Sequence, residues 1–167
     1  MQVRASADLR TDLRPGDIGA MSSLHGREYA AEYHLNFTFE AYVGGAIARF
    51  ALVLADDPEA GRIWMAFDDD DELLGCIAVT RTDAAEGWVR WFVVARHARG
   101  QGLGRRLLNE ALAYARERFE VLKLETFSEL TTAGHLYRSS GFEVTDSEPR
   151  LQWGREIQLQ HYALRFD

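Results

Sequence analysis

The sequence contains a single cysteine, few prolines and no long unbroken hydrophobic run, and each of these shortages excludes a class of protein. One thiol, Cys76, cannot form an internal disulfide and cannot supply a cysteine-based zinc site. The apolar runs, such as residues 91–95, are far shorter than the ~20 residues that cross a bilayer. Residues 1–17 lack the apolar core of a signal peptide. We therefore expect a reduced, cytoplasmic protein that does not bind a membrane.

Positive charge is also scarce, with 19 Lys and Arg residues against 26 Asp and Glu residues and a net charge of −7. A broad basic surface for nucleic acid is therefore not expected. The net charge suits a cationic small molecule, although it predicts little about the charge of a single pocket. No metal is expected, because none of the five histidines has the spacing of a metal site. The acidic run at residues 68–72 lacks the ligand pattern of a calcium loop, and we interpret it as the tip of a hairpin.

The chain of 167 residues has the size of one domain that can bury a hydrophobic core. Its content of 47% hydrophobic and 27% charged residues is typical of a globular protein. No internal repeat or long linker interrupts it. We therefore expect one domain over residues 1–167, with residues 1–10 frayed.

Hydrophobic periodicity predicts helices first, then a hairpin, and then strands and helices in alternation. Residues 17–33 are expected to form one helix, or two helices if Gly26 breaks the pattern. The other predicted helices are 37–54, 105–119 and 132–140, and the predicted strands are 62–67, 73–80, 88–94, 121–127, 142–145 and 157–166. We expect a register change in the last strand near residues 160–161. This order predicts a mixed α/β (α+β) domain rather than a repeated βαβ array.

The most informative segment is RGQGLGRR at residues 99–106, between the strongest predicted strand and an amphipathic helix. Glycine allows a tight turn and a close approach of a ligand to the main chain, and the segment has three: Gly100, Gly102 and Gly104. The first N–H groups of the following helix lack intrahelical acceptors and lie at the positive end of its dipole. Together with Arg99, Arg105 and Arg106, they predict a pyrophosphate site. The alternative is a turn that only packs the helix on the strand.

Several nucleotide-binding and hydrolytic classes do not fit this segment. A P-loop NTPase needs a Gly-Lys pair, which does not occur in the chain. A dinucleotide-binding fold needs a glycine at position 105, where the chain has Arg105, although Glu125 ends the next strand where a ribose-binding acid would stand. No second set of βαβ units follows, so a dinucleotide oxidoreductase ranks third among the alternatives. No G-x-S-x-G elbow of a serine hydrolase occurs.

Two motifs carry a resemblance to a known family. Arg99-x-x-Gly102-x-Gly104 matches the R/Q-x-x-G-x-G/A signature of the GNAT superfamily, the GCN5-related N-acetyltransferases, and AGHLYRSSGF at residues 133–142 resembles a second segment of that family. The specific match covers residues 62–145. The flanks LRPGDIGAM, HGREYAAEY and QWGREIQLQHYAL resemble the acetyltransferase half of MarR-type regulator–acetyltransferase fusions. The resemblance implies the GNAT fold, a mixed and mostly antiparallel sheet of about six to seven strands with about four helices and a splayed strand pair.

The resemblance also implies acetyl-coenzyme A as co-substrate. The main chain of residues 100–105 would hold the pyrophosphate, and the strand end at residues 92–94 would pair with the pantetheine arm. A backbone N–H near Val93 or Val94 would stabilise the developing oxyanion. The cofactor-binding residues expected from it are Phe92, Val93, Val94, Arg99, Gly100, Gln101, Gly102, Leu103, Gly104 and Arg105.

Tyr137 matches the general acid of the family, which would protonate the departing coenzyme A thiolate. A phenol titrates near 10 and a thiol near 8.5, so a tyrosine can hydrogen-bond the sulfur without ionising first. The alternative is that Tyr137 only packs between Leu136 and Phe142. Leu130 stands where the family often has asparagine, which leaves the contacts to coenzyme A at that point open.

The activity implied by the resemblance is transfer of acetyl to a primary amine, on a small molecule, by direct attack in a ternary complex. Residues expected at the acceptor site are Glu28, Tyr29, Glu32, Glu125 and Trp153, where Trp153 either shapes the pocket or seals the core. The pattern does not choose the general base among the glutamates Glu28, Glu32, Glu125 and Glu129. The alternative function is a non-catalytic acyl-coenzyme A-binding module that regulates a partner. A homodimer is an expectation from the family alone.

Overall fold

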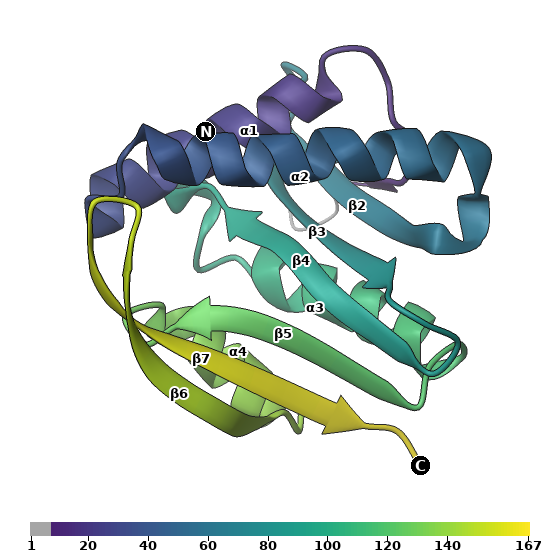
Figure 1. The fold of residues 1–167 in the computed structure, drawn as a ribbon. Coiled ribbons are helices and arrows are strands. Elements are labelled where there is room, and N and C mark those ends of the chain that lie inside the picture. The colour runs from purple at the N-terminus through teal and green to yellow at the C-terminus, as the bar shows by residue number, and fades with distance from the viewer. Residues whose placement is uncertain (1–7) are drawn as a thin grey trace.

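A computed structural model describes residues 8–167, which form a seven-stranded sheet with four α-helices (Figure 1). The strands are β1 (Leu9–Arg10), β2 (Gly61–Phe67), β3 (Leu73–Arg81), β4 (Glu86–Val94), β5 (Val121–Phe127), β6 (Glu143–Gln152) and β7 (Arg155–Arg165). The helices are α1 (Asp17–Tyr33), α2 (Phe37–Asp56), α3 (Leu103–Arg116) and α4 (Thr131–Ser139), with 3₁₀ turns at Pro58–Ala60 and Arg96–Ala98. The strand order is β1-β2-β3-β4-β5-β7-β6, and every neighbouring pair is antiparallel except β4 and β5. The predicted mixed, mostly antiparallel architecture is confirmed.

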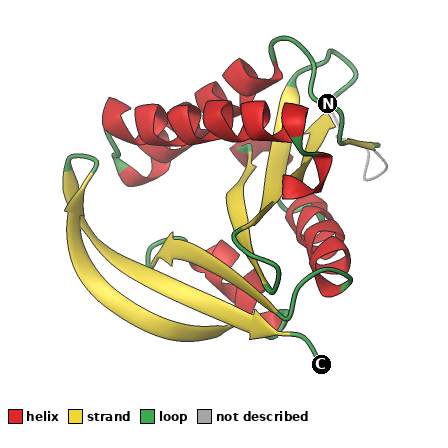
Figure 2. Ribbon diagram, turned by 45° about the vertical axis from the view of Figure 1, so that its right-hand side comes forward, coloured by secondary structure: helices red, strands yellow, loops and turns green. Residues whose placement is uncertain are grey.

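The sheet splits between β4 and β5. These two strands pair only where both begin, with Glu86 opposite Val121 and Trp88 opposite Lys123. Beyond that point they separate, and the two halves of the sheet run in different directions (Figure 2). β5 stays paired with β7 along its whole length. The split confirms the predicted splayed pair and leaves the second half of β4 without a ladder on its β5 side.

A β-bulge deforms the same half of β4. Residue Ile77 of β3 stands opposite two residues, Trp91 and Phe92, because Cys76 pairs with Val93 while Ala78 pairs with Arg90. Trp91 has a φ of 50°, a left-handed conformation that is uncommon for a bulky side chain. The Cys76 thiol donates to the Trp91 carbonyl oxygen at 3.3 Å, and burial raises the pKa of that thiol to about 12. The bulge therefore has a neutral, buried S–H as its support.

Helix α1 is continuous, so Gly26 does not break it. Gly26 and Gly44 lie instead where α1 and α2 pack closely. A Cβ atom on Gly26 would lie 2.8 Å from a carboxylate oxygen of Glu40, and one on Gly44 would lie 3.0 Å from the hydroxyl of Ser22. Small residues at these points let two helices approach. Both helices lie along the same side of strands β2 to β4, with α3 behind those strands and α4 behind β5 and β7 (Figure 1).

Helix α2 is long and apolar enough, by length and composition, to cross a membrane, with a mean hydropathy of 1.4 over its most apolar window. A single helix of this kind is weak evidence for a membrane span. One face of α2 belongs to the core through Phe39, Val43 and Ile47, whereas Phe37 and Leu52 are exposed. The length of unbroken apolar runs in the sequence did not reveal that α2 is this apolar, because charged residues interrupt those runs.

One expectation about the N-terminal end of the chain needs correction. The prediction that residues 1–10 are frayed is wrong for Leu9 and Arg10, which form β1 and pair with Ala66 and Met65. The Arg10 guanidinium holds Asp17 with two hydrogen bonds of 2.6 and 2.9 Å, which fixes this segment on α1. Residues 1–7 lie outside the described residues.

Strand β6 continues well past the predicted residues 142–145. Almost all of its residues are exposed, so no hydrophobic alternation marks it in the sequence. The register change expected near residues 160–161 does exist. It lies on the partner strand, between Val144 and Asp146 of β6, opposite Tyr162 and His161.

Candidate active site

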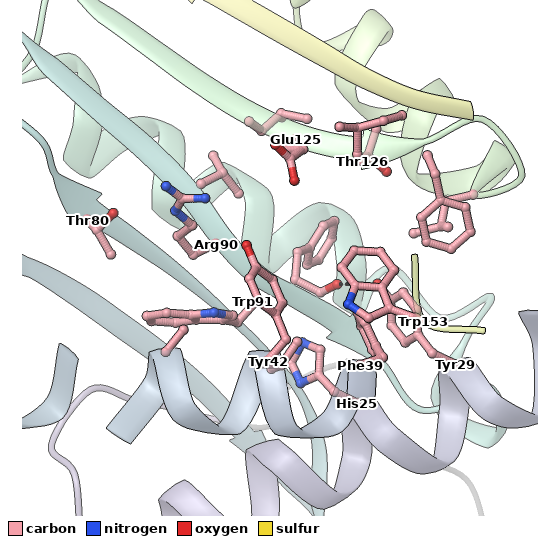
Figure 3. A pocket seen from close by; sticks show the side chains of 18 of the residues that line it. His25, Tyr29, Phe39, Tyr42, Thr80, Arg90, Trp91, Glu125, Thr126 and Trp153 are labelled. Atoms are coloured by element: carbon pink, nitrogen blue, oxygen red, sulfur yellow. Dashed lines mark hydrogen bonds between the residues drawn. The ribbon is translucent and has the colours of Figure 1, made fainter. Parts of the chain in front are cut away.

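Two cavities lie along the splayed strands. We call the first the loop cavity: it has a volume of about 420 Å³ and is lined by the end of β4, the 99–105 loop, the start of α4 and part of α1. We call the second the aromatic cavity: it has a volume of about 380 Å³ and lies between α2, β4, β5 and the turn that joins β6 to β7 (Figure 3). Tyr29, Phe92 and Leu130 line both. The two cavities are therefore neighbours that meet at the bulged end of β4.

The loop cavity has the geometry of an anion site. Gly100 and Gly102 have φ values of 75° and 83°, and a Cβ atom on either would meet nothing within 4 Å. Helix α3 begins at Leu103 with no side-chain cap and no acidic residue in its first turn. Its first N–H groups therefore point into open space at the positive end of the helix. Nine of the ten residues predicted to bind the cofactor line this cavity, and the exception is Gln101, which is exposed on the loop.

Arg99 ties the loop to the rest of the site. Its Nε donates to the carbonyl oxygen of Val94 at 3.0 Å, and its terminal nitrogens lie 2.5 Å from Glu32 and 3.9 Å from Glu28. Glu28 is buried and accepts from both the backbone N and the Nε of Arg96, at 3.3 and 3.1 Å. Glu28 thus supports the loop and lines neither cavity, whereas Glu32 lines the loop cavity.

The end of β4 forms the boundary between the cavities. The Tyr29 hydroxyl donates to the carbonyl oxygen of Phe92 at 3.4 Å, which connects α1 to this strand. Burial raises the pKa of Tyr29, so it remains a neutral donor. Tyr137 lies on α4 beside the same strand, with its ring centroid 6.1 Å from that of Phe92. It lines the aromatic cavity and is only 5% exposed.

Tyr137 combines burial with an uncommitted hydroxyl. Within residues 8–167, no group hydrogen-bonds to its oxygen. Burial raises its pKa above the ordinary value of a phenol. The side chain therefore offers a proton or a hydrogen bond toward the cavity and stays neutral at physiological pH.

The aromatic cavity has an apolar wall with one buried histidine. Nine of its lining residues are Phe, Tyr or Trp. The His25 Nδ1 donates to the carbonyl oxygen of Met21 at 2.7 Å, because a carbonyl oxygen can only accept. Burial lowers the pKa of His25 to about 4 and leaves the ring neutral. Trp153 forms the outer wall from the turn after β6, with ring centroids 5.0 Å from Phe39 and 5.6 Å from Tyr42. Trp153 thus lines the cavity and also packs against the core.

Charged groups are few on the wall of the aromatic cavity: Arg49, Arg90 and Glu125. Glu125 on β5 bonds to His161 of β7, with 2.9 Å between Oε2 and Nε2. Glu129 lines the loop cavity instead, where Arg155 holds its carboxylate at 2.5 and 3.1 Å. Of the four glutamates considered as the base, only Glu125 faces the aromatic cavity. No group of three or more metal-ligating side chains occurs in the described part of the chain.

Comparison with known proteins identifies the fold and the family. The model of the acetyltransferase (GNAT) family matches residues 23–142. The chain belongs to this family. It is therefore an acyltransferase, and the two cavities at the splayed strands are the candidate active site of a GNAT acetyltransferase.

Solved structures support the fold of this acetyltransferase. A GNAT-family acetyltransferase from Staphylococcus aureus Mu50 is 15% identical over 97% of this chain and 100% of that chain, with a TM-score of 0.78. A spermidine N-acetyltransferase from Vibrio cholerae, solved with CoA and spermine, is 19% identical over 97% and 96% of the two chains, with a TM-score of 0.70. A GNAT-family acetyltransferase from Elizabethkingia anophelis, solved with acetyl-CoA bound, is 21% identical over 68% and 82%, with a TM-score of 0.53.

Sequence reasoning missed part of the wall of the aromatic cavity in this GNAT acetyltransferase. The missed residues come from elements far apart in the chain, and they include Phe39, Tyr42, Arg49, Arg90 and Trp91. One signal was available for β4, because WVRWFVV places a charged residue within an otherwise apolar strand. A charge at such a position needs either solvent or a ligand.

Proposed function

We propose that this GNAT acetyltransferase moves an acetyl group from acetyl-CoA to a primary amine of a small molecule, by direct attack in a ternary complex. The observation that carries this proposal is the meeting of the two cavities at Tyr29 and Phe92. One cavity has an anion-binding loop and the other a largely apolar wall. A donor bound in the first would present its reacting end to an acceptor in the second.

Acetyl-CoA fits the loop cavity by its chemistry. The diphosphate would lie against the main chain of residues 100–105, where open glycines and the first N–H groups of α3 face the cavity. Arg105 is exposed beside them and would add positive charge. The pantetheine arm would follow the unpaired edge of β4 at residues 92–94, and the thioester would lie where the cavities meet. Structures that contain CoA or acetyl-CoA among the similar proteins support this choice of donor.

Proton transfer completes the chemistry. An alkylamine is mostly protonated at neutral pH, so a base must remove a proton before the nitrogen attacks the thioester carbon. Glu125 is the carboxylate on the acceptor side, and it would take that proton. Attack forms a tetrahedral intermediate, which collapses as the nitrogen loses its second proton, the C–S bond breaks and the thiolate of CoA leaves. Tyr137 would donate a hydrogen bond or a proton to that sulfur, and the proton lost by the nitrogen would restore a phenol that had given its own.

A turnover assay tests this function. Purified protein is mixed with acetyl-CoA and a panel of primary amines, and release of free CoA thiol is measured. Thiol release that depends on an amine, with the acetylated amine found by mass spectrometry, is the expected result. Tight binding of acetyl-CoA without release across the panel would favour the acyl-CoA-binding regulatory module instead.

Several broader expectations stay predictions. These are the organisation of residues 1–167 as one acetyltransferase domain, the cytoplasmic location, the lack of nucleic-acid and membrane partners, and the formation of a homodimer. The likeness of the flanks to the acetyltransferase half of MarR-type fusions also stays a prediction. A sedimentation experiment would decide the oligomeric state.

A further inference from the structure

The charges on the wall of the aromatic cavity differ from the charge of the whole chain. The chain has a net charge of −7. The charged side chains on this wall are two arginines, Arg49 and Arg90, and one carboxylate, Glu125. His25 is neutral because burial lowers its pKa to about 4. The cavity is therefore positively charged in an acidic protein.

Both arginines have donors available for a ligand. Arg90 stacks on Trp88, with its guanidinium carbon 4.5 Å from the ring centroid. Stacking leaves the N–H groups at the edge of the guanidinium free. Arg49 extends from α2 and is exposed. Across residues 8–167, neither guanidinium has a hydrogen bond or an ion pair.

The single carboxylate does not balance these two cations. Glu125 forms no ion pair with Arg90, and its Oε2 bonds to His161. In the view of Figure 3, Arg90 and Thr80 lie at one end of the cavity, away from Trp153. A second ammonium group at that end would face the Arg90 guanidinium, which is unfavourable in a partly desolvated pocket. A carboxylate there would accept charge-assisted hydrogen bonds from it.

The other residues of the cavity wall favour an acceptor molecule with an apolar body. Nine Phe, Tyr and Trp residues line the cavity, including Trp91, Phe92 and Trp153. Arg90 precedes Phe92 by two positions on β4, so the arginine end lies several ångströms from the meeting point of the cavities. We infer that the acceptor is a primary amine joined through an aromatic or similarly apolar body to a carboxylate. The amine faces Tyr137 and the carboxylate faces Arg90, with Arg49 as the second cation of the cavity wall. This inference rests on the proposed function.

Three matched amines test the inference. They are para-(aminomethyl)benzoate, para-methylbenzylamine and para-xylylenediamine, which share a benzylamine and carry a negative, neutral or positive group at the para position. We expect kcat/KM with acetyl-CoA to be highest for the carboxylate, about tenfold above the neutral compound, and lowest for the diamine. Equal or better turnover of the diamine would overturn the inference.

Substitution of the arginines assigns the effect to them. Arg90→Gln and Arg49→Gln should each raise KM for para-(aminomethyl)benzoate, about tenfold for Arg90→Gln, and leave kcat and the KM of para-methylbenzylamine within about twofold. Arg27→Gln is the matched control, because Arg27 is exposed on α1, bonds to Ser23 and lines neither cavity. An unchanged preference for the carboxylate in both cavity variants would contradict the inference.

A binding measurement separates this inference from the proposed function. Trp91 and Trp153 line the cavity, so tryptophan fluorescence can report the binding of each amine to the protein loaded with CoA. Preferential binding of the carboxylate compound without thiol release in the turnover assay would support the inference and refute the proposed function. Thiol release together with equal binding of all three compounds would support the proposed function and refute the inference about the carboxylate.

Discussion

Oε2 of Glu125 lies 2.9 Å from Nε2 of His161, and the two residues stand directly opposite each other in the pairing of β5 with β7. On its other side, Nδ1 of His161 lies 3.6 Å from the carboxylate of Asp146 on β6. A row of titratable groups thus leads from the aromatic cavity to an exposed outer strand. A proton taken up by Glu125 would have a route to solvent along this row.

Replacement of Glu125 by Gln tests its role as the base. Glutamine keeps a hydrogen-bond partner for His161 but cannot take a proton. We expect kcat/KM at neutral pH to fall about a hundredfold, with the Kd of acetyl-CoA unchanged. Glu110→Gln, at an exposed position of α3, should behave like the unmodified enzyme. Full activity of Glu125→Gln would assign proton removal to another group or to water.

Replacement of Tyr137 by Phe tests its role as the acid. The change removes only the hydroxyl, which has no hydrogen-bond partner among residues 8–167, so the fold should be retained. We expect kcat to fall by about tenfold or more, with acetyl-CoA binding nearly intact. Tyr114→Phe, on α3 outside both cavities, is the control. Unchanged turnover would leave Tyr137 as a packing residue.

The pH profile provides a second check on Tyr137. Because burial raises the pKa of this phenol, its ionisation should not reduce activity at or below pH ~10. A loss of kcat between neutral pH and pH ~9 that disappears in Tyr137→Phe would show that the phenol ionises in the working range. That outcome would contradict a buried, neutral donor.

Replacement of Gly102 by Ala tests the anion-binding loop. Gly102 has a φ of 83°, where an L side chain is strained by about 1 kcal/mol, and its added methyl group would project into the space assigned to the diphosphate. We expect the Kd of acetyl-CoA to rise about tenfold or more. Gly19→Ala, at an exposed helical position with open space around it, should bind normally and be slightly more stable. Equal affinities of the two variants for acetyl-CoA would show that the diphosphate does not bind at this loop.

Burial of His25 predicts an acid-sensitive fold. The pKa of His25 falls from 6.5 to about 4, so the unfolded chain binds a proton in this range that the folded chain does not. Stability is therefore fully present above pH 6.5 and falls as the pH decreases toward 4, by roughly 2–4 kcal/mol in total. Thermal unfolding from pH 7 to pH 4 measures this slope. His25→Asn should flatten the dependence of stability on pH, whereas His97→Gln, at an exposed position, should not. If stability fell equally with pH in both variants, the assignment to His25 would be contradicted.

The parts of the site that the sequence predicted are those built from neighbouring residues. The 99–105 loop is a local unit of a strand end, glycines and a helix start, so its spacing was visible without tertiary contacts. The splayed pair followed from the family resemblance.

Other parts depended on contacts between distant segments. Glu28 and Arg96 are 68 positions apart in the chain, and only the packing of α1 on the loop reveals that Glu28 supports the loop. Gly26 looked like a helix break because helix propensity ignores the partner helix, whereas its lack of a side chain serves contact with Glu40. The arginines of the aromatic cavity could not be placed, because α2 and β4 meet only in the folded chain.

The most direct test of this account is a crystal structure of the protein with acetyl-CoA bound. We predict diphosphate oxygens within ~3 Å of the main-chain nitrogens of residues 102–105, and the thioester beside Phe92 and Tyr137. The account would be contradicted if acetyl-CoA bound elsewhere, with no diphosphate at the loop and no thioester beside Tyr137.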